Sequence, residues 1–165
     1  MPVVSNTSPI LNLAIIGRLS LLYDQFGEIW IPDAVLEELR IQEDLPGTQV
    51  IRQALKDKWM RIQEVSDQSL VRVLRRDLDN GEAAAIALAM QVKAEWILLD
   101  EKEGRKIAKT LGLKVAGILG ILLRAQHEGR LPSFQTVMDQ LRDVAGFHIG
   151  AELYSDLMRE SSENK

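Results

Sequence analysis

The sequence predicts a three-layer α/β/α domain with a mainly parallel central sheet of four or five strands. Short apolar runs alternate along the chain with longer segments of helical periodicity. Several runs are apolar at consecutive positions, which is typical of strands buried on both faces. The 165 residues, 46% of them hydrophobic and 27% charged, suit a single globular domain. We expect this domain to cover residues 1–160, with a flexible polar tail at 161–165.

The expected strands are short. Their β-branched and aromatic residues favour extended structure over helix. Four of them are the apolar runs at 3–4, 29–31, 96–99 and 114–116, and a fifth is expected at 61–65.

Capping residues mark where the expected helices begin. Ser8, which precedes a proline, is expected to cap the first helix, and Asp33 the second. Asp79 and Asp100 are each expected to open a further helix, and Gly112 follows the second of these as a C′ residue. The expected helices are 10–16, 34–40, 79–92, 100–111, 118–128, 134–144 and 151–159.

Composition excludes several classes of protein. Cysteine is absent, which excludes disulfide frameworks, thiolate metal sites and cysteine nucleophiles. The net charge of −4, from 20 Lys and Arg against 24 Asp and Glu, argues against a generic polyanion binder. No run of 18 apolar residues and no basic leader is present, so we expect a cytoplasmic protein that does not enter a membrane.

Four polar residues occupy positions where a ligand site is expected. Asn6 and Asp100 directly follow apolar strands, and ligands bind at the carboxyl ends of the strands in parallel sheets. Glu38 lies at the border of the buried stripe of its helix, whereas Glu37 points away from that stripe. Glu82 shares a helix face with apolar residues. A carboxylate there requires a partner, because burying an unpaired charge is costly.

Each of these residues also has a structural explanation. Asp79 with Glu82, and Asp100 with Glu103, have the spacing of capping boxes. The partner of Glu82 is therefore a cap, a metal ion or Arg105. Asn6 is also a residue that bends the chain readily.

Converging carboxylates would form a site for a hard cation. Mg²⁺ and Mn²⁺ prefer oxygen ligands, and such sites hydrolyse phosphodiesters. No glycine-rich nucleotide-binding loop is present. Two basic clusters are either solvated helix faces, the commoner case, or contacts to phosphates. They are Arg72, Arg75 and Arg76, and Arg105, Lys106 and Lys109.

Taken together, the motifs resemble those of PIN-domain proteins. The segments 3–11, 31–39, 81–89 and 98–101 resemble the four motifs of that family in order. The stretch 104–149 is similar to one bacterial and archaeal subfamily, which is related to the VapC-type toxins and largely catalogued as a domain of unknown function. The resemblance covers nearly the whole chain.

The resemblance implies a Mg²⁺- or Mn²⁺-dependent endoribonuclease. Glu38, Glu82 and Asp100 would be the catalytic, metal-binding acids, with Glu103 as an accessory acid and Ser8 as polar support. It also implies RNA as substrate, and a toxin of a toxin–antitoxin pair with a small antitoxin protein and a second copy of the chain as partners.

One position departs from the family pattern. The first acid is typically aspartate, and Asn6 stands there as a neutral, weaker ligand. Two alternatives therefore stay open. One is a PIN-fold protein that binds RNA or protein with little or no nuclease activity, and the other is an α/β domain whose acids are only helix caps.

Overall fold

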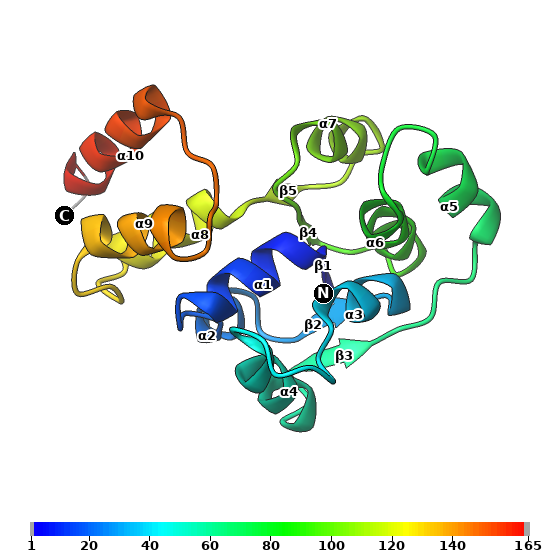
Figure 1. Ribbon diagram of the computed structural model, residues 1–165. Helices are drawn as coiled ribbons and strands as arrows, with labels where there is room; N and C mark the ends of the chain where they lie inside the picture. The colour runs from blue at the N-terminus through cyan, green and yellow to red at the C-terminus, as the bar shows by residue number, and fades with distance from the viewer. Residues whose placement is uncertain (1, 164–165) are drawn as a thin grey trace.

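The computed structural model describes residues 2–163 and contains one all-parallel sheet of five strands (Figure 1). The strand order is β3-β2-β1-β4-β5, and every neighbouring pair is parallel. The strands are β1 (Val3–Ser5), β2 (Ile29–Ile31), β3 (Met60–Ile62), β4 (Trp96–Leu98) and β5 (Val115–Ala116). The predicted fold class is confirmed.

Consecutive apolar residues of each central strand supply two separate cores. Side chains alternate between the faces of a strand. Val3 and Leu98 accordingly belong to one buried cluster, and Val4 and Ile97 to the other. Both faces of the sheet are therefore covered, as the unbroken apolar runs predicted.

Helices form the two outer layers. Residues of α1, α2, α4, α8 and α9 contribute to the cluster on one face, and residues of α5, α6 and α7 to the cluster on the other. Figure 1 shows these two groups on opposite sides of the strands. The C-terminal helix α10 contacts α8 and α9 and lies farthest from the sheet.

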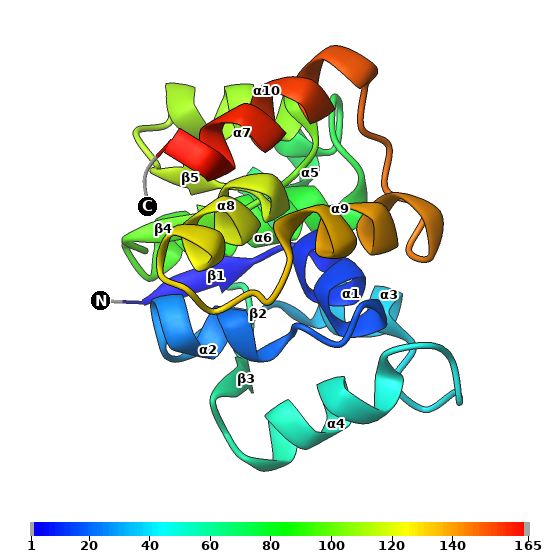
Figure 2. The same ribbon diagram turned by 90° about the vertical axis from the view of Figure 1, so that its left-hand side faces the viewer.

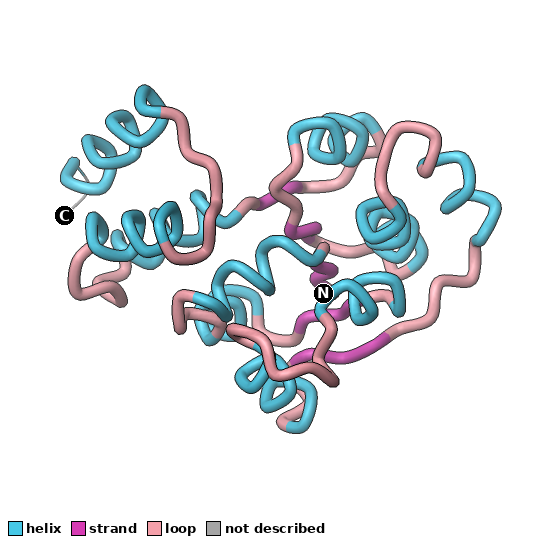
Figure 3. Tube along the Cα trace, viewed as in Figure 1, coloured by secondary structure: helices cyan, strands magenta, loops and turns pink. Residues whose placement is uncertain are grey.

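The helices account for most of the chain, as Figure 3 shows. On the first face they are α1 (Thr7–Ile15), α2 (Ser20–Phe26), α4 (Thr48–Lys56), α8 (Ile118–His127), α9 (Phe134–Asp143) and α10 (Ala151–Glu163), with α3 (Asp33–Leu39) at the end of the sheet. On the second face they are α5 (Gln68–Leu74), α6 (Asn80–Gln91) and α7 (Lys102–Thr110). The sequence did not indicate α2, α4 or α5, which have seven to nine residues. Helices this short depend on tertiary packing for their stability.

The expected caps are right at α6 and wrong at three other helices. Asp79 caps α6 with a complete capping box. At the C-terminal end of α7, the expected C′ residue Gly112 has the positive φ of +85° that suits a glycine there. Asn6, not Ser8, occupies the N-cap position of α1. Pro32 precedes α3, which begins at Asp33 itself.

At α7 the predicted Asp100–Glu103 capping box does not form. Glu101 takes the N-cap position of this helix and makes no side-chain cap hydrogen bond. The Asp100 carboxylate is engaged elsewhere, by Ser8 and by the backbone of Ile118.

Two segments differ from expectation in extent. Strand β3 ends at Ile62 instead of reaching residue 65. Helix α10 continues through the first part of the expected tail to Glu163, and Ser161 is buried with its hydroxyl donating to the Met158 carbonyl at 2.7 Å. Residues 164–165 of that tail lie outside the described residues.

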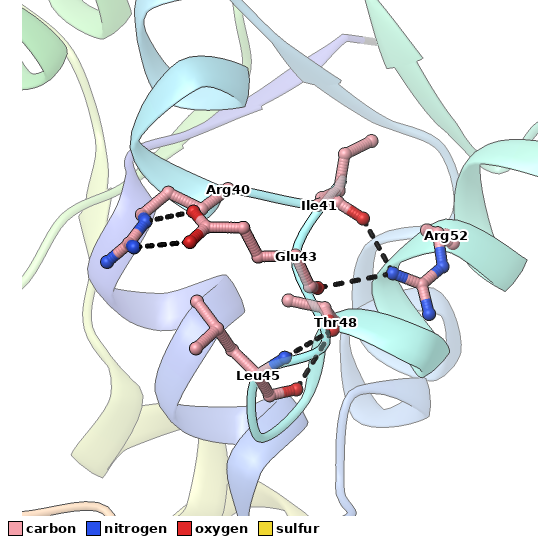
Figure 4. Close-up of polar contacts among 6 residues, drawn as sticks. All are labelled: Arg40, Ile41, Glu43, Leu45, Thr48 and Arg52. Atoms are coloured by element: carbon pink, nitrogen blue, oxygen red, sulfur yellow. Dashed lines mark hydrogen bonds and ion pairs between the residues drawn. The ribbon is translucent and has the colours of Figure 1, made fainter.

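The loop between α3 and α4 is held by side-chain contacts to backbone (Figure 4). Arg52 Nη1 donates to the carbonyl of Ile41 at 2.6 Å, and the Thr48 hydroxyl donates to the carbonyl of Leu45 at 2.9 Å. Arg40, which ends α3 with a φ of +51°, forms an ion pair with Glu43. These contacts fix the end of the helix that carries Glu38.

The strand order reverses beside β1. The chain leaves β1 toward β2 on one side, and later returns to the other side of β1 as β4. Ligands bind at the carboxyl edge of a parallel sheet where the strand order reverses. Figure 2 shows β1 running toward the start of α1 at this edge. Within residues 2–163, no helix has the length and apolarity needed to cross a membrane.

Candidate functional site

Asn6 and Asp100 lie at the point where the strand order reverses. Asn6 directly follows β1, and its backbone N–H donates to the Leu98 carbonyl of β4 at 2.9 Å. Asp100 comes two residues after the end of β4. The structure therefore brings these two predicted residues to the same edge of neighbouring strands.

The Asn6 side chain is buried and has an oxygen without a partner. The residue is 4% exposed, and its Oδ1 accepts no hydrogen bond from any described residue. Buried amide oxygens are normally hydrogen-bonded, because leaving one unpaired costs about 1–3 kcal/mol. An oxygen left in this state is suited to a ligand such as a cation.

Asp100 is held by two hydrogen bonds from distant parts of the chain. Its Oδ2 accepts from the Ser8 hydroxyl and its Oδ1 from the Ile118 backbone N–H, both at 2.7 Å. Burial raises the pKa of the Asp100 carboxyl, while these hydrogen bonds and the nearby Arg105 charge oppose that rise. Residues at the starts of α1 and α8 therefore hold the Asp100 side chain in place, and its carboxylate oxygens keep lone pairs for a ligand.

Arg105 lies beside Asp100 and is not the partner of Glu82. Its Nη1 donates to the Leu99 carbonyl at 2.8 Å. Gly117 allows this arrangement, because a Cβ there would lie 2.6 Å from Arg105 Nη1 and 3.1 Å from Asp100 Oδ1.

Glu38 packs onto the first turn of α6. Its Oε1 accepts from the Thr7 hydroxyl at 3.2 Å, and a Cβ on Gly81 would lie 1.9 Å from that same oxygen. The residue as a whole is exposed, but partial burial of its carboxyl, followed by the charge of Asp79, raises its pKa, and the Thr7 hydrogen bond opposes this rise. The glycine at position 81 therefore makes the room that the Glu38 carboxylate occupies.

Glu82 is buried, at 6% exposure. Its Oε1 accepts from the Asp79 backbone N–H at a long 3.3 Å, which completes the capping box of α6. Its Oε2 lies against Gly104 of α7, where a Cβ would approach within 2.8 Å. Burial is the main cause that raises its pKa to about 7. The side chain and charge of Asp79 add to this rise, whereas the hydrogen bond from the Asp79 backbone N–H opposes it.

Residues at the starts of α1 and α6 connect the predicted site residues Asn6, Glu38, Glu82 and Asp100, whereas Glu103 lies apart from them. Thr7 and Ser8, adjacent on α1, bond to Glu38 and Asp100 respectively. Glu38 and Glu82 both lie at the first turn of α6. Glu103 is exposed on α7 and makes no side-chain hydrogen bond with any residue in 2–163. No three acidic or histidine side chains of the described residues form a ready-made metal site.

The donor set nonetheless fits a hard cation that retains water ligands. All the donors are oxygens, one of them the unpartnered amide oxygen of Asn6. Mg²⁺ commonly binds through one or two carboxylates and keeps several waters, so a complete protein cage is not needed. The raised pKa of Glu82 means that binding a cation near pH 7 would also displace a proton.

Two residues that were not predicted for this site act on these acids. Thr7 bonds to Glu38, and the charge of Asp79 raises the pKa of both Glu38 and Glu82. The capping box had singled out Asp79, but only as a cap. Nothing local to the sequence links Thr7 to a residue 31 positions away.

The comparisons with known proteins give one match. The sequence model of a protein family described as the PIN domain matches residues 2–163. No curated protein and no solved structure matches the chain significantly.

Proposed function

Since the chain belongs to the PIN-domain family, we propose that it is a Mg²⁺- or Mn²⁺-dependent ribonuclease that hydrolyses phosphodiester bonds of RNA. PIN domains are generally nucleases, and such nucleases typically use divalent metals. The observation that carries the proposal is the buried, unpartnered Asn6 Oδ1 at the same edge of the sheet as Asp100. A structural role alone leaves that oxygen unexplained.

Glu38, Glu82 and Asp100 are the proposed ligands, and Asn6 adds a neutral oxygen. The metal would activate water and neutralise charge on the scissile phosphate. Ser8 and the Ile118 N–H hold the Asp100 carboxylate in place. Glu82 must release its proton to bind, and a pKa of about 7 makes that loss easy at neutral pH.

Adjacent glutamates on α3 provide a matched test. RNA is incubated with the purified protein in Mn²⁺ or in EDTA, and the same is done with Glu38→Gln and with Glu37→Gln. Glu37 is exposed and its side chain makes no hydrogen bond with the described residues. We expect cleavage that EDTA abolishes, that Glu38→Gln reduces at least tenfold, and that Glu37→Gln leaves unchanged. Cleavage that survives EDTA, or that both variants lower equally, would contradict the assignment.

Asn6 favours a second candidate, a protein that binds RNA or a protein partner with little turnover. An amide lacks the ionic attraction of a carboxylate, which weakens metal binding. In the same experiment this candidate predicts retention of RNA without cleavage at any Mn²⁺ concentration.

A toxin role is a finer proposal, with a small antitoxin and a second copy of this chain as partners. It is supported by the sequence resemblance to the VapC-related subfamily. Expression should then arrest growth, and co-expression of the product of a small adjacent reading frame should relieve the arrest. Growth that is unaffected by active protein would contradict the toxin role.

A further inference from the structure

An apolar cavity of about 470 Å³ opens beside Asp100 and Arg105. Its volume is within the range of roughly 300–1,000 Å³ for small-molecule sites. Three aromatic side chains from separate segments line it. They are Phe26 of α2, Trp96 of β4 and Phe147 of the α9–α10 connection.

The polar residue Gln25 also lines the cavity and is held in place. Its Nε2 donates to the Ile121 carbonyl at 2.8 Å, and its Oε1 is buried without a partner among the described residues. Aromatic surface from three segments beside a fixed side chain suits a flat heterocycle.

On the other side of Arg105, helix α7 presents a stripe of cations. Lys102, Arg105, Lys106 and Lys109 have i, i+3, i+4 and i+7 spacing, so they fall within an arc of about 100° and extend about 10 Å along the helix. Together with Asp100 they line a second hollow. None of the four forms an ion pair with an acidic residue in 2–163. Arg105 is held by the Leu99 carbonyl beside Asp100, whereas Lys102, Lys106 and Lys109 are exposed.

We propose that the α7 stripe binds phosphates of the RNA strand and that the apolar cavity takes one unpaired base of the same strand. Asp100 and Arg105 line both hollows, so a single strand crossing from one to the other passes Asp100, one of the proposed metal ligands. This inference rests on the proposed function, because it assigns contacts to the substrate of that same site. It favours RNA over a protein partner because phosphate charge matches the stripe and a base matches the cavity.

Gly120 of α8 allows the cavity to be filled without disturbing the fold. It lines the cavity, its φ is not positive, and a Cβ there would have no atom within 4 Å. Gly120→Leu therefore adds volume to the hollow, and Gly120→Ala is the matched control for the change in helix propensity. Affinity for a labelled single-stranded RNA is measured in EDTA, so that no cleavage is required.

We expect Gly120→Leu to weaken single-strand binding about tenfold relative to Gly120→Ala, which corresponds to about 1.4 kcal/mol. A perfect duplex of the same sequence should bind at least tenfold more weakly to the parent, because its bases are not free to enter. Equal binding of both variants, or of duplex and single strand, would overturn the base site.

The stripe is tested through the salt dependence of binding. Each phosphate contact contributes about 0.7 to the slope of log affinity against log salt for a single strand, so Lys102→Gln/Lys106→Gln/Lys109→Gln should lower that slope by about 2. The control, Lys56→Gln/Lys58→Gln/Lys93→Gln, removes the same charge near the amino ends of β3 and β4, at the opposite edge of the sheet. An equal slope change in both triple variants would overturn the stripe.

These outcomes are independent of turnover. Binding that follows the expected pattern without any cleavage in Mn²⁺ would contradict the ribonuclease proposal alone. Cleavage by a protein whose cavity and stripe variants behave like their controls would overturn this inference alone.

Discussion

Replacing Gly81 by alanine tests whether the position of the Glu38 carboxylate matters for metal binding. The new Cβ would lie 1.9 Å from Glu38 Oε1 and 2.8 Å from Cδ, so the carboxyl group must move away. The obstacle is the end of a flexible side chain, so the backbone need not shift. The substitution should therefore displace one proposed ligand and leave the fold intact.

The expected change in stability is small because two effects oppose each other. Alanine in a helix is favoured over glycine by about 0.5–1 kcal/mol, whereas loss of the Thr7–Glu38 hydrogen bond costs about 0.5–1.5 kcal/mol. The net change should lie within about 1 kcal/mol, or roughly 2–4 °C in Tm for a protein of this size.

The effect on metal binding should be larger and separable by thermal melts across a Mn²⁺ titration. At a Mn²⁺ concentration of about 100 Kd the parent gains about 2.7 kcal/mol, and a tenfold weaker site gains about 1.4 kcal/mol at the same concentration. Gly81→Ala should show this reduced shift. In a protein that already carries Glu38→Ala, adding Gly81→Ala should only stabilise the helix. The Mn²⁺-induced Tm shift should then be the same as for Glu38→Ala alone. A Gly81→Ala protein with the full Mn²⁺ shift would refute the role of Glu38.

Two further predictions concern the charge state of the site. Asn6→Asp adds a carboxylate at a buried position, so the metal-free protein should lose about 1–3 kcal/mol while its Mn²⁺-induced Tm shift grows. Asp100→Ala should abolish that shift. Identical melts in all three proteins, with and without Mn²⁺, would leave the acids with a structural role only. The Glu82 carboxyl has a folded pKa of about 7 against 4.5 as its ordinary value, so it favours the folded state while protonated. Urea unfolding should show metal-free stability falling as pH rises from about 4.5 through 7. Glu82→Gln should reduce that fall without abolishing it, because the raised pKa values of Glu38 and Asp100 act in the same direction. An unchanged pH dependence in Glu82→Gln would contradict the raised pKa of Glu82.

The sheet could be predicted from the sequence because its signal is local. Two adjacent apolar residues such as Val3 and Val4 must face opposite sides of a strand, and both can be buried only where helices cover both faces. The capping box of Asp79 and Glu82 is equally local, since both of its hydrogen bonds close over three residues. Helix α4 was missed although its buried Ile51 and Ala54 lie three residues apart on one face, because its N-cap position is Gly47, which offers no capping side chain to mark its start.

The amino-acid sequence by itself determined which residues stand at the carboxyl ends of the strands, including the neutral Asn6. Only the tertiary structure decided how they are held. Asp100 accepts from Ser8, 92 positions away, and from Ile118, 18 positions away, so it does not cap its own helix. Burial sets the pKa of Glu82 and leaves the Asn6 oxygen without a partner. Both effects depend on neighbours that packing brings together from distant segments, and a local pattern carries no information about such neighbours.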